Sequence, residues 1–224
     1  MSDPILLSIA VLGGTGKEGK GLAYRWARAG YHILIGSRRP EKARAAADEL
    51  TNLLDGKALI EGMGNQEAAE KANIIVLTVP FAAHRDTLEA VREMLQGKLL
   101  IDVTVPLLPP KVSKVQMPAA GSAAQEAQEI LGEEAQVASA FQNVSYEHLM
   151  GEAEAPCDVL VTGSSPGARS ETLRLVEAAG LTGWDAGPLE NSVVAEGLTS
   201  VLIGINRKYG SKHAGIKITG VSSS

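Results

Sequence analysis

Cysteine is almost absent from this chain, which has a single one, Cys157, among 224 residues. One cysteine cannot close an internal disulfide, and no second cysteine or histidine stands beside it at the spacing of metal ligands. The sequence therefore excludes a disulfide-stabilised scaffold and predicts no metal site. We interpret Cys157 as a small buried apolar residue in a reducing compartment.

Long apolar runs and an excess of positive charge are missing as well. No apolar stretch approaches the roughly 20 residues that cross a bilayer, and the first residues lack the basic segment and cleavage site of a secretory signal. The chain has 21 Lys and Arg against 26 Asp and Glu, a formal net charge of -5. No basic face is available to follow nucleic-acid phosphates. We expect a soluble, cytoplasmic protein with neither a membrane nor a nucleic-acid partner.

Aromatic residues are few, whereas glycine occurs 24 times, which favours helices packed closely on a sheet. Apolar runs typical of strands occupy residues 5–12, 31–35, 73–79, 98–103, 136–141 and 158–162, with weaker ones at 58–61 and 183–186. Helical patterns lie at residues 16–29, 41–54, 66–72, 82–95, 123–131, 168–179 and 189–207. This alternation predicts an α/β fold with a Rossmann-type, doubly wound parallel sheet.

A glycine motif follows the first predicted strand. Gly14, Gly16 and Gly19 form a G-x-G-x-x-G pattern that ends a strand and opens a helix, the context in which the pattern indicates dinucleotide binding. Gly14 would make the tight turn, Gly16 would let the pyrophosphate approach, and Gly19 would let helix and strand pack closely. The alternative is an ordinary glycine-rich turn.

The end of the second predicted strand indicates which dinucleotide is bound. An NAD site usually has an Asp or Glu here to hold the ribose hydroxyls, but this chain has Ser37, Arg38 and Arg39, followed by Lys42. A hydroxyl and a guanidinium fork suit the 2′-phosphate of NADP. The alternative is a solvated basic corner that pairs with Glu41.

The strand predicted at 73–79 ends beside the point where the nicotinamide ribose would pass. Pro80 stops this strand, and His84 follows on the first turn of the next helix, beside Arg85. We interpret His84 as an exposed surface histidine and not as an acid or base.

Four motifs together resemble one family. Residues 12–21, 36–43, 76–80 and 185–192 resemble, in this order, the NADPH-dependent reductases of the deazaflavin coenzyme F420, the F420H2:NADP+ oxidoreductases. The similarity runs over nearly the whole chain. Several relatives have His-Thr-Ile-Pro-Ala where this chain has residues 142–146.

The resemblance implies cofactors, site residues and assembly. NADP(H) and coenzyme F420 would be the two co-substrates of a homodimer that buries residues 193–205. Residues 1–141 would form the NADP-binding Rossmann domain, and residues 142–224 a smaller C-terminal α/β domain that completes the deazaflavin site and the dimer interface. The NADP side would comprise Gly14, Thr15, Gly16, Lys17, Glu18, Gly19, Ser37, Arg38, Arg39, Lys42, Val79, Pro80 and Ala83. The deazaflavin side would comprise Gln142, Asn143, Val144, Tyr146 and Ala214, with the amides of Gln142 and Asn143 bonded to the carbonyl edge of the ring.

The reaction implied is the reversible transfer of a hydride between the nicotinamide and the deazaflavin. Neither ring carbon needs a protein acid or base, and the sequence shows no His–carboxylate pair, Ser–His–Asp set or metal cluster. We therefore assign positioning roles and no catalytic residue. Two alternatives remain: a soluble NADPH-dependent flavin or ferric reductase, and a protein that senses NADPH without turnover.

Overall fold

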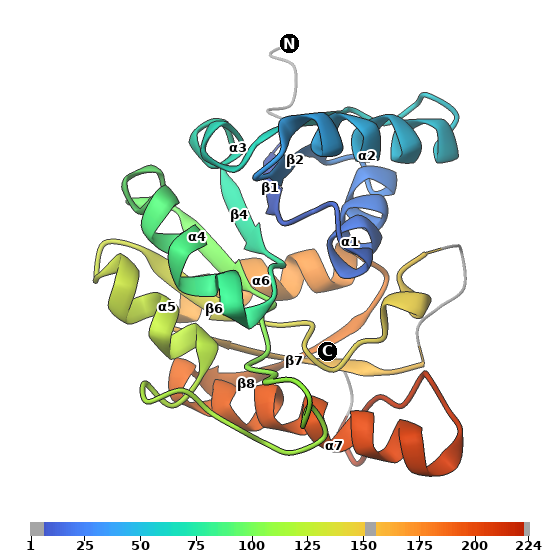
Figure 1. Cartoon of the computed structure of the whole chain (residues 1–224), viewed down its shortest axis with the longest axis vertical. Helices are drawn as coiled ribbons and strands as arrows, with labels where there is room; N and C mark the ends of the chain where they lie inside the picture. The colour runs from blue at the N-terminus through green and yellow to red at the C-terminus, as the bar shows by residue number, and fades with distance from the viewer. Residues whose placement is uncertain (1–6, 151–155, 222–224) are drawn as a thin grey trace.

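The computed structural model describes residues 7–150 and 156–221 (Figure 1). Eight strands form one sheet in the order β3-β2-β1-β4-β5-β6-β7-β8. The strands are β1 (Ser8–Leu12), β2 (His32–Ser37), β3 (Ile60–Gly64), β4 (Ile74–Leu77), β5 (Leu99–Asp102), β6 (Gln136–Ser139), β7 (Asp158–Gly163) and β8 (Thr182–Pro188).

Helices connect these strands. The α-helices are α1 (Lys17–Arg28), α2 (Pro40–Leu53), α3 (Asn65–Lys71), α4 (His84–Val91), α5 (Ala123–Leu131), α6 (Pro166–Ala178) and α7 (Ser192–Tyr209). Short 3-10 turns are η1 (Phe81–Ala83), η2 (Arg92–Leu95), η3 (Tyr146–His148) and η4 (Leu189–Asn191). No helix within the described part of the chain is long and apolar enough to cross a membrane.

The predicted α/β class is confirmed. The six neighbouring strands β3, β2, β1, β4, β5 and β6 all run in the same direction, as predicted for a parallel sheet. Strands β7 and β8 are parallel to each other, but β7 pairs antiparallel with β6, so these two strands run the opposite way. The segment after residue 141 thus extends the same sheet with two reversed strands.

Each face of the sheet has its own apolar core. On one face, side chains of α1, α2 and α6 pack together, and Trp26 joins two of these helices by donating its indole N–H to the carbonyl of Leu175. On the other face, α3, α4 and α5 contribute Ala68, Leu88 and Ala127. Figure 1 shows α4 and α5 side by side on one flank and α1 and α2 on the other. Helices on both faces explain why the central strands are continuous apolar runs.

Several predicted boundaries are wrong by two residues or more. The helix expected at 189–207 begins at Ser192, after the turn η4, and the strand expected at 136–141 ends at Ser139. Of the strand expected at 5–12, residues 5 and 6 lie outside the described residues, and β1 begins at Ser8. The weak strand expected at 58–61 is β3, displaced to Ile60–Gly64, where two glycines dilute the apolar pattern. The helix expected at 82–95 is divided into η1, α4 and η2. The extended piece expected at 183–186 is the full strand β8. Cys157 is buried, as predicted, and the tail passes beside it, because the N–H of Asp158 donates to the carbonyl of Ile216.

Candidate active site

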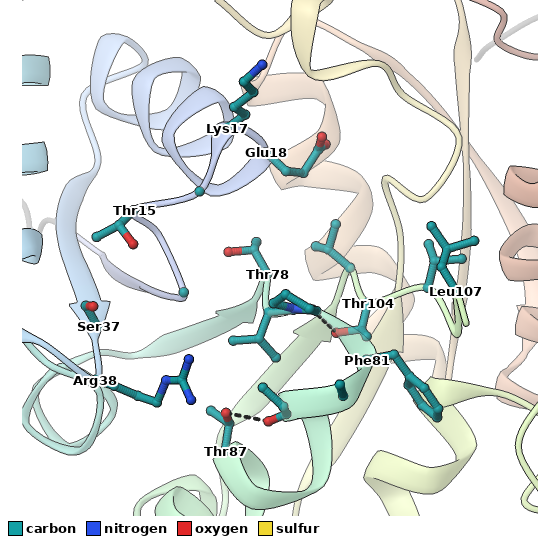
Figure 2. Close-up of a pocket in the computed structure, with 18 of the residues that line it drawn as sticks. Thr15, Lys17, Glu18, Ser37, Arg38, Thr78, Phe81, Thr87, Thr104 and Leu107 are labelled. Atoms are coloured by element: carbon teal, nitrogen blue, oxygen red, sulfur yellow. Dashed lines mark hydrogen bonds between the residues drawn. The ribbon is translucent and has the colours of Figure 1, made fainter. Parts of the chain in front are cut away.

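A cavity of about 1000 Å³ opens at the carboxyl ends of β1 and β4, where the order of the strands reverses (Figure 2). This is the place at which open α/β sheets bind their ligands. The cavity brings together most of the residues predicted for NADP: Thr15, Gly16, Lys17, Glu18, Ser37, Arg38, Arg39, Lys42, Val79, Pro80 and Ala83. Gly14 and Gly19 are buried and do not line this cavity.

The turn between β1 and α1 is shaped by glycines. Gly13, which the sequence pattern did not single out, adopts the left-handed conformation (φ 78°) and lines the cavity. A Cβ on Gly14 would meet the Val11 carbonyl oxygen at 2.7 Å, and one on Gly19 would meet Thr78 Oγ1 at 2.6 Å. These positions therefore require glycine for close packing.

Gly16, in contrast to Gly14 and Gly19, is not closely packed. A Cβ built there would meet only the Gly13 carbonyl oxygen, at 3.6 Å, so the backbone is open toward the cavity. The helix α1 begins at the next residue, Lys17, and the N–H groups of its first turn have no partner within the helix. Together with the helix dipole, they form a site for an anionic group.

A basic corner lies at the end of β2. Ser37 is buried, whereas Arg38, Arg39 and Lys42 are exposed. The Ser37 hydroxyl accepts a hydrogen bond from the Arg39 N–H at 3.2 Å and can still donate its own hydrogen. Figure 2 shows Arg38 extending from the end of β2 into the cavity. No ion pair between this corner and Glu41 occurs among the described residues, so the three cations are available to a phosphate.

A second hollow, of about 560 Å³, continues from Ser37 and Arg38 toward α3. It includes Asn65, a residue that sequence reasoning missed, whose Oδ1 is buried with no hydrogen-bond partner in the described structure. The sequence did not mark this residue, because the strand expected here ended at residue 61 and not at Gly64, directly before Asn65. The hollow extends the large cavity on the side of the basic corner.

The opposite wall is the segment after β4. The carbonyl of Val79 accepts a hydrogen bond from Thr104 Oγ1 at 3.4 Å, and the carbonyl of Ala83 accepts one from Thr87 Oγ1 at 2.7 Å. These bonds hold Val79, Pro80 and Ala83 against the cavity. The wall is thus fixed from both β5 and α4.

A smaller cavity, of about 180 Å³, adjoins the first turn of α1 from the other side. It brings together all the residues predicted for the deazaflavin with helix α7 and the C-terminal tail. The lining comprises Glu18, Gln142, Asn143, Val144, Ser145, Tyr146, Thr199, Leu202, Ile203, Asn206, Lys212 and Ala214. Glu18 lines both this cavity and the large one, so the two meet at this residue.

The amide groups in the small cavity are already engaged. Gln142 Nε2 donates to the carbonyl of Asp102 and to Ser139 Oγ, both at 2.8 Å. Asn143 Nδ2 donates to the carbonyl of Ala195 at 2.8 Å. Gln142 Oε1, in contrast, is buried without a partner in the described structure. Gln142 therefore offers an acceptor, not the donor that we expected for a ring carbonyl.

Two contacts fix this segment on α1. Phe141 has a positive φ of 73°, a strained conformation for an aromatic residue, and its ring packs edge-on against Trp26 at 5.7 Å. Lys17 Nζ donates to Tyr146 Oη at 3.0 Å and lies 4.5 Å from the centre of its ring. This hydrogen bond raises the pKa of Lys17. The helix after the glycine turn is therefore linked directly to the wall of the small cavity.

The interpretation of His84 as an exposed histidine is wrong, and so is the expectation that no His–carboxylate pair exists. His84 is fully buried, with Nε2 at 2.7 Å from Asp102 Oδ2 and Nδ1 at 3.2 Å from Glu126 Oε1. Burial by itself lowers the pKa of His84, but the bonds to Asp102 and Glu126 outweigh it and raise the pKa. Because residues 81–83 form a 3-10 turn, α4 begins later than predicted, and its first residue faces β5.

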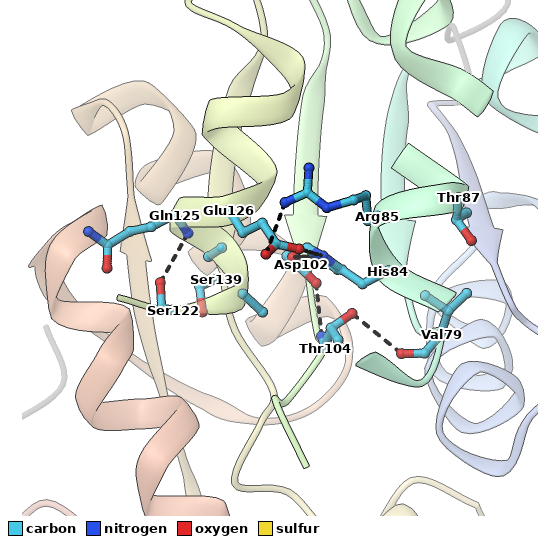
Figure 3. A network of polar contacts seen from close by, with 12 residues as sticks. Val79, His84, Arg85, Thr87, Asp102, Thr104, Ser122, Gln125, Glu126 and Ser139 are labelled. Carbon is cyan, nitrogen blue, oxygen red and sulfur yellow. Dashed lines mark hydrogen bonds and ion pairs between the residues drawn. The ribbon is translucent and has the colours of Figure 1, made fainter. Parts of the chain in front are cut away.

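This network ends at the large cavity. His84 is bonded to both Glu126 and Asp102, and Thr104 links Asp102 to Val79 (Figure 3). Asp102 Oδ1 accepts the N–H of Thr104 at 2.9 Å. His84 thus fixes Asp102 at the end of β5, and Thr104, bonded to Asp102, fixes the cavity wall at Val79.

A Rossmann-type sheet with an open glycine turn and an available basic corner defines a class, the oxidoreductases that bind NADP(H). Comparison with known proteins narrows this class. The family model described as "NADP oxidoreductase coenzyme F420-dependent" matches residues 8–106. The F420-dependent NADP reductase of Methanocaldococcus jannaschii is 37% identical over 222 residues, covering 95% of this chain and 98% of that protein.

Two further comparisons agree. The F420-dependent NADP reductase of Methanothermobacter marburgensis is 40% identical and covers 95% of this chain and 98% of that protein. A crystal structure from an Arthrobacter species, provisionally described as an F420-dependent NADP reductase, has a TM-score of 0.78 at 25% identity, over 95% of this chain and 99% of that one. The chain belongs to the family of coenzyme F420-dependent NADP oxidoreductases, and the resemblance found in the sequence is confirmed.

Proposed function

We propose that this protein transfers a hydride reversibly between NADP(H), bound in the large cavity, and coenzyme F420, bound with its ring in the small one. The observation that carries the proposal is that the two cavities adjoin at the first turn of α1. When the two rings stack there, a hydride can pass directly between a carbon of each. The protein then has to bind, orient and exclude water.

On the NADP side, the open backbone at Gly16 and the N–H groups after it fit a pyrophosphate. Ser37, Arg38, Arg39 and Lys42 fit a 2′-phosphate, because they offer a hydroxyl and three cations without an ion-pair partner among the described residues. Val79, Pro80 and Ala83 would lie along the nicotinamide and its ribose. Figure 2 shows Ser37 and Arg38 beside the same space as Thr15 and Thr78.

On the deazaflavin side, we assign Gln142, Asn143, Val144, Tyr146 and Ala214. The unpartnered Gln142 Oε1 supports a polar ring edge, since it can accept from a ring N–H. Asn143 serves by shaping the wall, because its amide N–H groups are bound to α7.

The proposal also covers the division of the chain into two units and its assembly into a homodimer. Residues 1–141 would form the NADP-binding unit, and residues 142–224 would complete the deazaflavin site and a homodimer interface. Exposed apolar side chains on α7, such as Val194 (63% exposed) and Val201 (46% exposed), support burial of this helix between two copies. A cytoplasmic location is part of the same proposal.

Mixing the protein with NADPH and, separately, oxidised coenzyme F420, FMN, FAD and a ferric chelate tests the function. We expect loss of the absorbance of the deazaflavin only. Turnover with FMN, FAD or the ferric chelate instead would favour the alternative reductase, and tight NADPH binding without any turnover would favour a sensor. Equilibrium binding of NADPH by fluorescence, measured in parallel, separates failed binding from failed transfer.

A further inference from the structure

Glu18 is a carboxyl group at the junction of the two cavities, and nothing derived so far uses it as an acid. It is the second residue of α1 and contributes to the lining of both cavities. Its Oε1 is enclosed and has no hydrogen-bond partner in the described structure. Figure 2 shows its side chain leaving the first turn of α1 in a different direction from that of Lys17.

The surroundings favour the acid form of this group. Burial raises the pKa of Glu18 to about 8, because a carboxylate without donors is poorly solvated there. The cation that precedes it in the chain, Lys17, is bonded to Tyr146, which in turn donates to Glu147. Lys212 lines the same small cavity and makes no ion pair in the described structure. None of these groups forms a hydrogen bond with the buried Oε1 of Glu18 in the described structure.

The small cavity also lacks side-chain donors where we expected them. The amide N–H groups of Gln142 and Asn143 are bonded within the protein. A carboxylic acid at Glu18 supplies an O–H donor on the side where the cavities meet.

We infer that Glu18 holds, at Oε1, the proton that the deazaflavin ring gains when it accepts a hydride, and receives it back in the reverse direction. This inference rests on the proposed function. The hydride carries its electron pair from the nicotinamide, which is oxidised, to the deazaflavin, which is reduced. The O–H bond of Glu18 breaks as an N–H bond forms on the ring, and the carboxylate then takes a proton from water.

Proton linkage tests this role without turnover. The pyrophosphate of NADP+ adds negative charge near Glu18 and disfavours its carboxylate, so the pKa should rise on binding. At pH 8.5 we expect uptake on the order of 0.5 proton per NADP+ if the pKa rises by about one unit. The 2′-phosphate titrates near pH 6 and is ionised throughout. Calorimetry in buffers of different ionisation enthalpy measures this uptake.

Three variants complete the design. Glu18→Gln keeps the shape and removes the acid, so proton uptake should vanish while NADP+ affinity changes only a few-fold. Glu49→Gln removes a surface carboxylate paired with Lys20 at 2.8 Å and should match the unmodified protein. Glu18→Asp keeps an acid of shorter reach and should retain part of the uptake.

Single-turnover transfer from NADPH to coenzyme F420 gives the second readout. With wild type, the rate should fall as the pH rises through the pKa of Glu18 in the nucleotide-bound protein, about one unit above its ligand-free value of about 8. Glu18→Gln should be roughly 10²-fold slower and lack this fall. An unchanged rate and pH profile in Glu18→Gln, or equal proton uptake in both proteins, would overturn the proton role alone. Absence of any transfer by wild type would overturn the proposed function instead.

Discussion

Replacing His84 by Leu tests whether the buried pair with Asp102 holds the fold beside the cavity. Both side chains are fully buried, and the two atoms that form the pair are 2.7 Å apart. The variant keeps similar volume but leaves the carboxylate of Asp102, among the described residues, with only the N–H of Thr104 as a partner. Removing one partner of a buried pair costs about 3–5 kcal/mol. We expect a loss of this size in the free energy of unfolding.

A second histidine pair provides the control. His32 Nε2 lies 2.8 Å from Glu61 Oε1, nearly the same distance, but the two side chains are 22% and 50% exposed. His32→Leu should therefore cost no more than about 1 kcal/mol. Urea unfolding of both variants, followed by circular dichroism, measures the two losses. Equal losses would refute the reasoning, since burial and not distance is the claimed difference.

The same pair predicts a pH dependence. The pKa of His84 is raised in the folded protein. Its contribution to stability is therefore fully present below the unfolded value of about 6.5 and is lost as the pH rises through the folded pKa. The difference in stability between wild type and His84→Leu should shrink across this window. A constant difference would show that folding does not shift the pKa of His84, and one that grows with pH would show that folding lowers it; either result would contradict the prediction.

Three further predictions concern the ligands. Arg38→Ala should weaken NADPH binding by about 1.5–3 kcal/mol and leave NADH nearly unchanged; titration with both nucleotides measures this, and parallel losses would place the arginine elsewhere. Gly16→Val should abolish dinucleotide binding while the unfolding curve is retained, because its side chain would enter the open space at the turn; tight binding would contradict this. Val144→Trp should leave NADPH binding intact but slow single-turnover hydride transfer by on the order of 10²-fold; an unchanged rate would move the deazaflavin away from this cavity.

The parts of the fold that the sequence predicted are those that depend on burial of continuous segments. Strands β4 and β5 and the end of β1 were located closely because a strand covered on both faces is apolar throughout. The reversal of β7 was not predicted, since a buried strand has the same composition in either direction. Strand β3 was displaced because its glycines carry no apolar signal.

The glycine turn and the basic corner were predicted because each is formed by neighbours in sequence. His84 was misassigned because its partners, Asp102 and Glu126, lie 18 and 42 residues away. A histidine in the first turn of a helix, beside Arg85, suggests an exposed side chain. Only the packing of α4 against β5 and α5 shows that His84 is buried. The sequence offered one signal of a buried partner for His84, namely Asp102, a charged residue at the end of a buried strand.

Glu18 shows how a local rule and a tertiary effect can oppose each other. A carboxylate in the first turn of a helix is stabilised by the dipole, by about 0.3–1 kcal/mol near the surface. A buried polar oxygen without a donor loses about 1–3 kcal/mol, and more when it is charged. The family resemblance places Glu18 on the NADP side, in a first helical turn where the dipole favours the carboxylate. Because its Oε1 is enclosed, desolvation is the larger effect and raises the pKa of this residue between the two cavities.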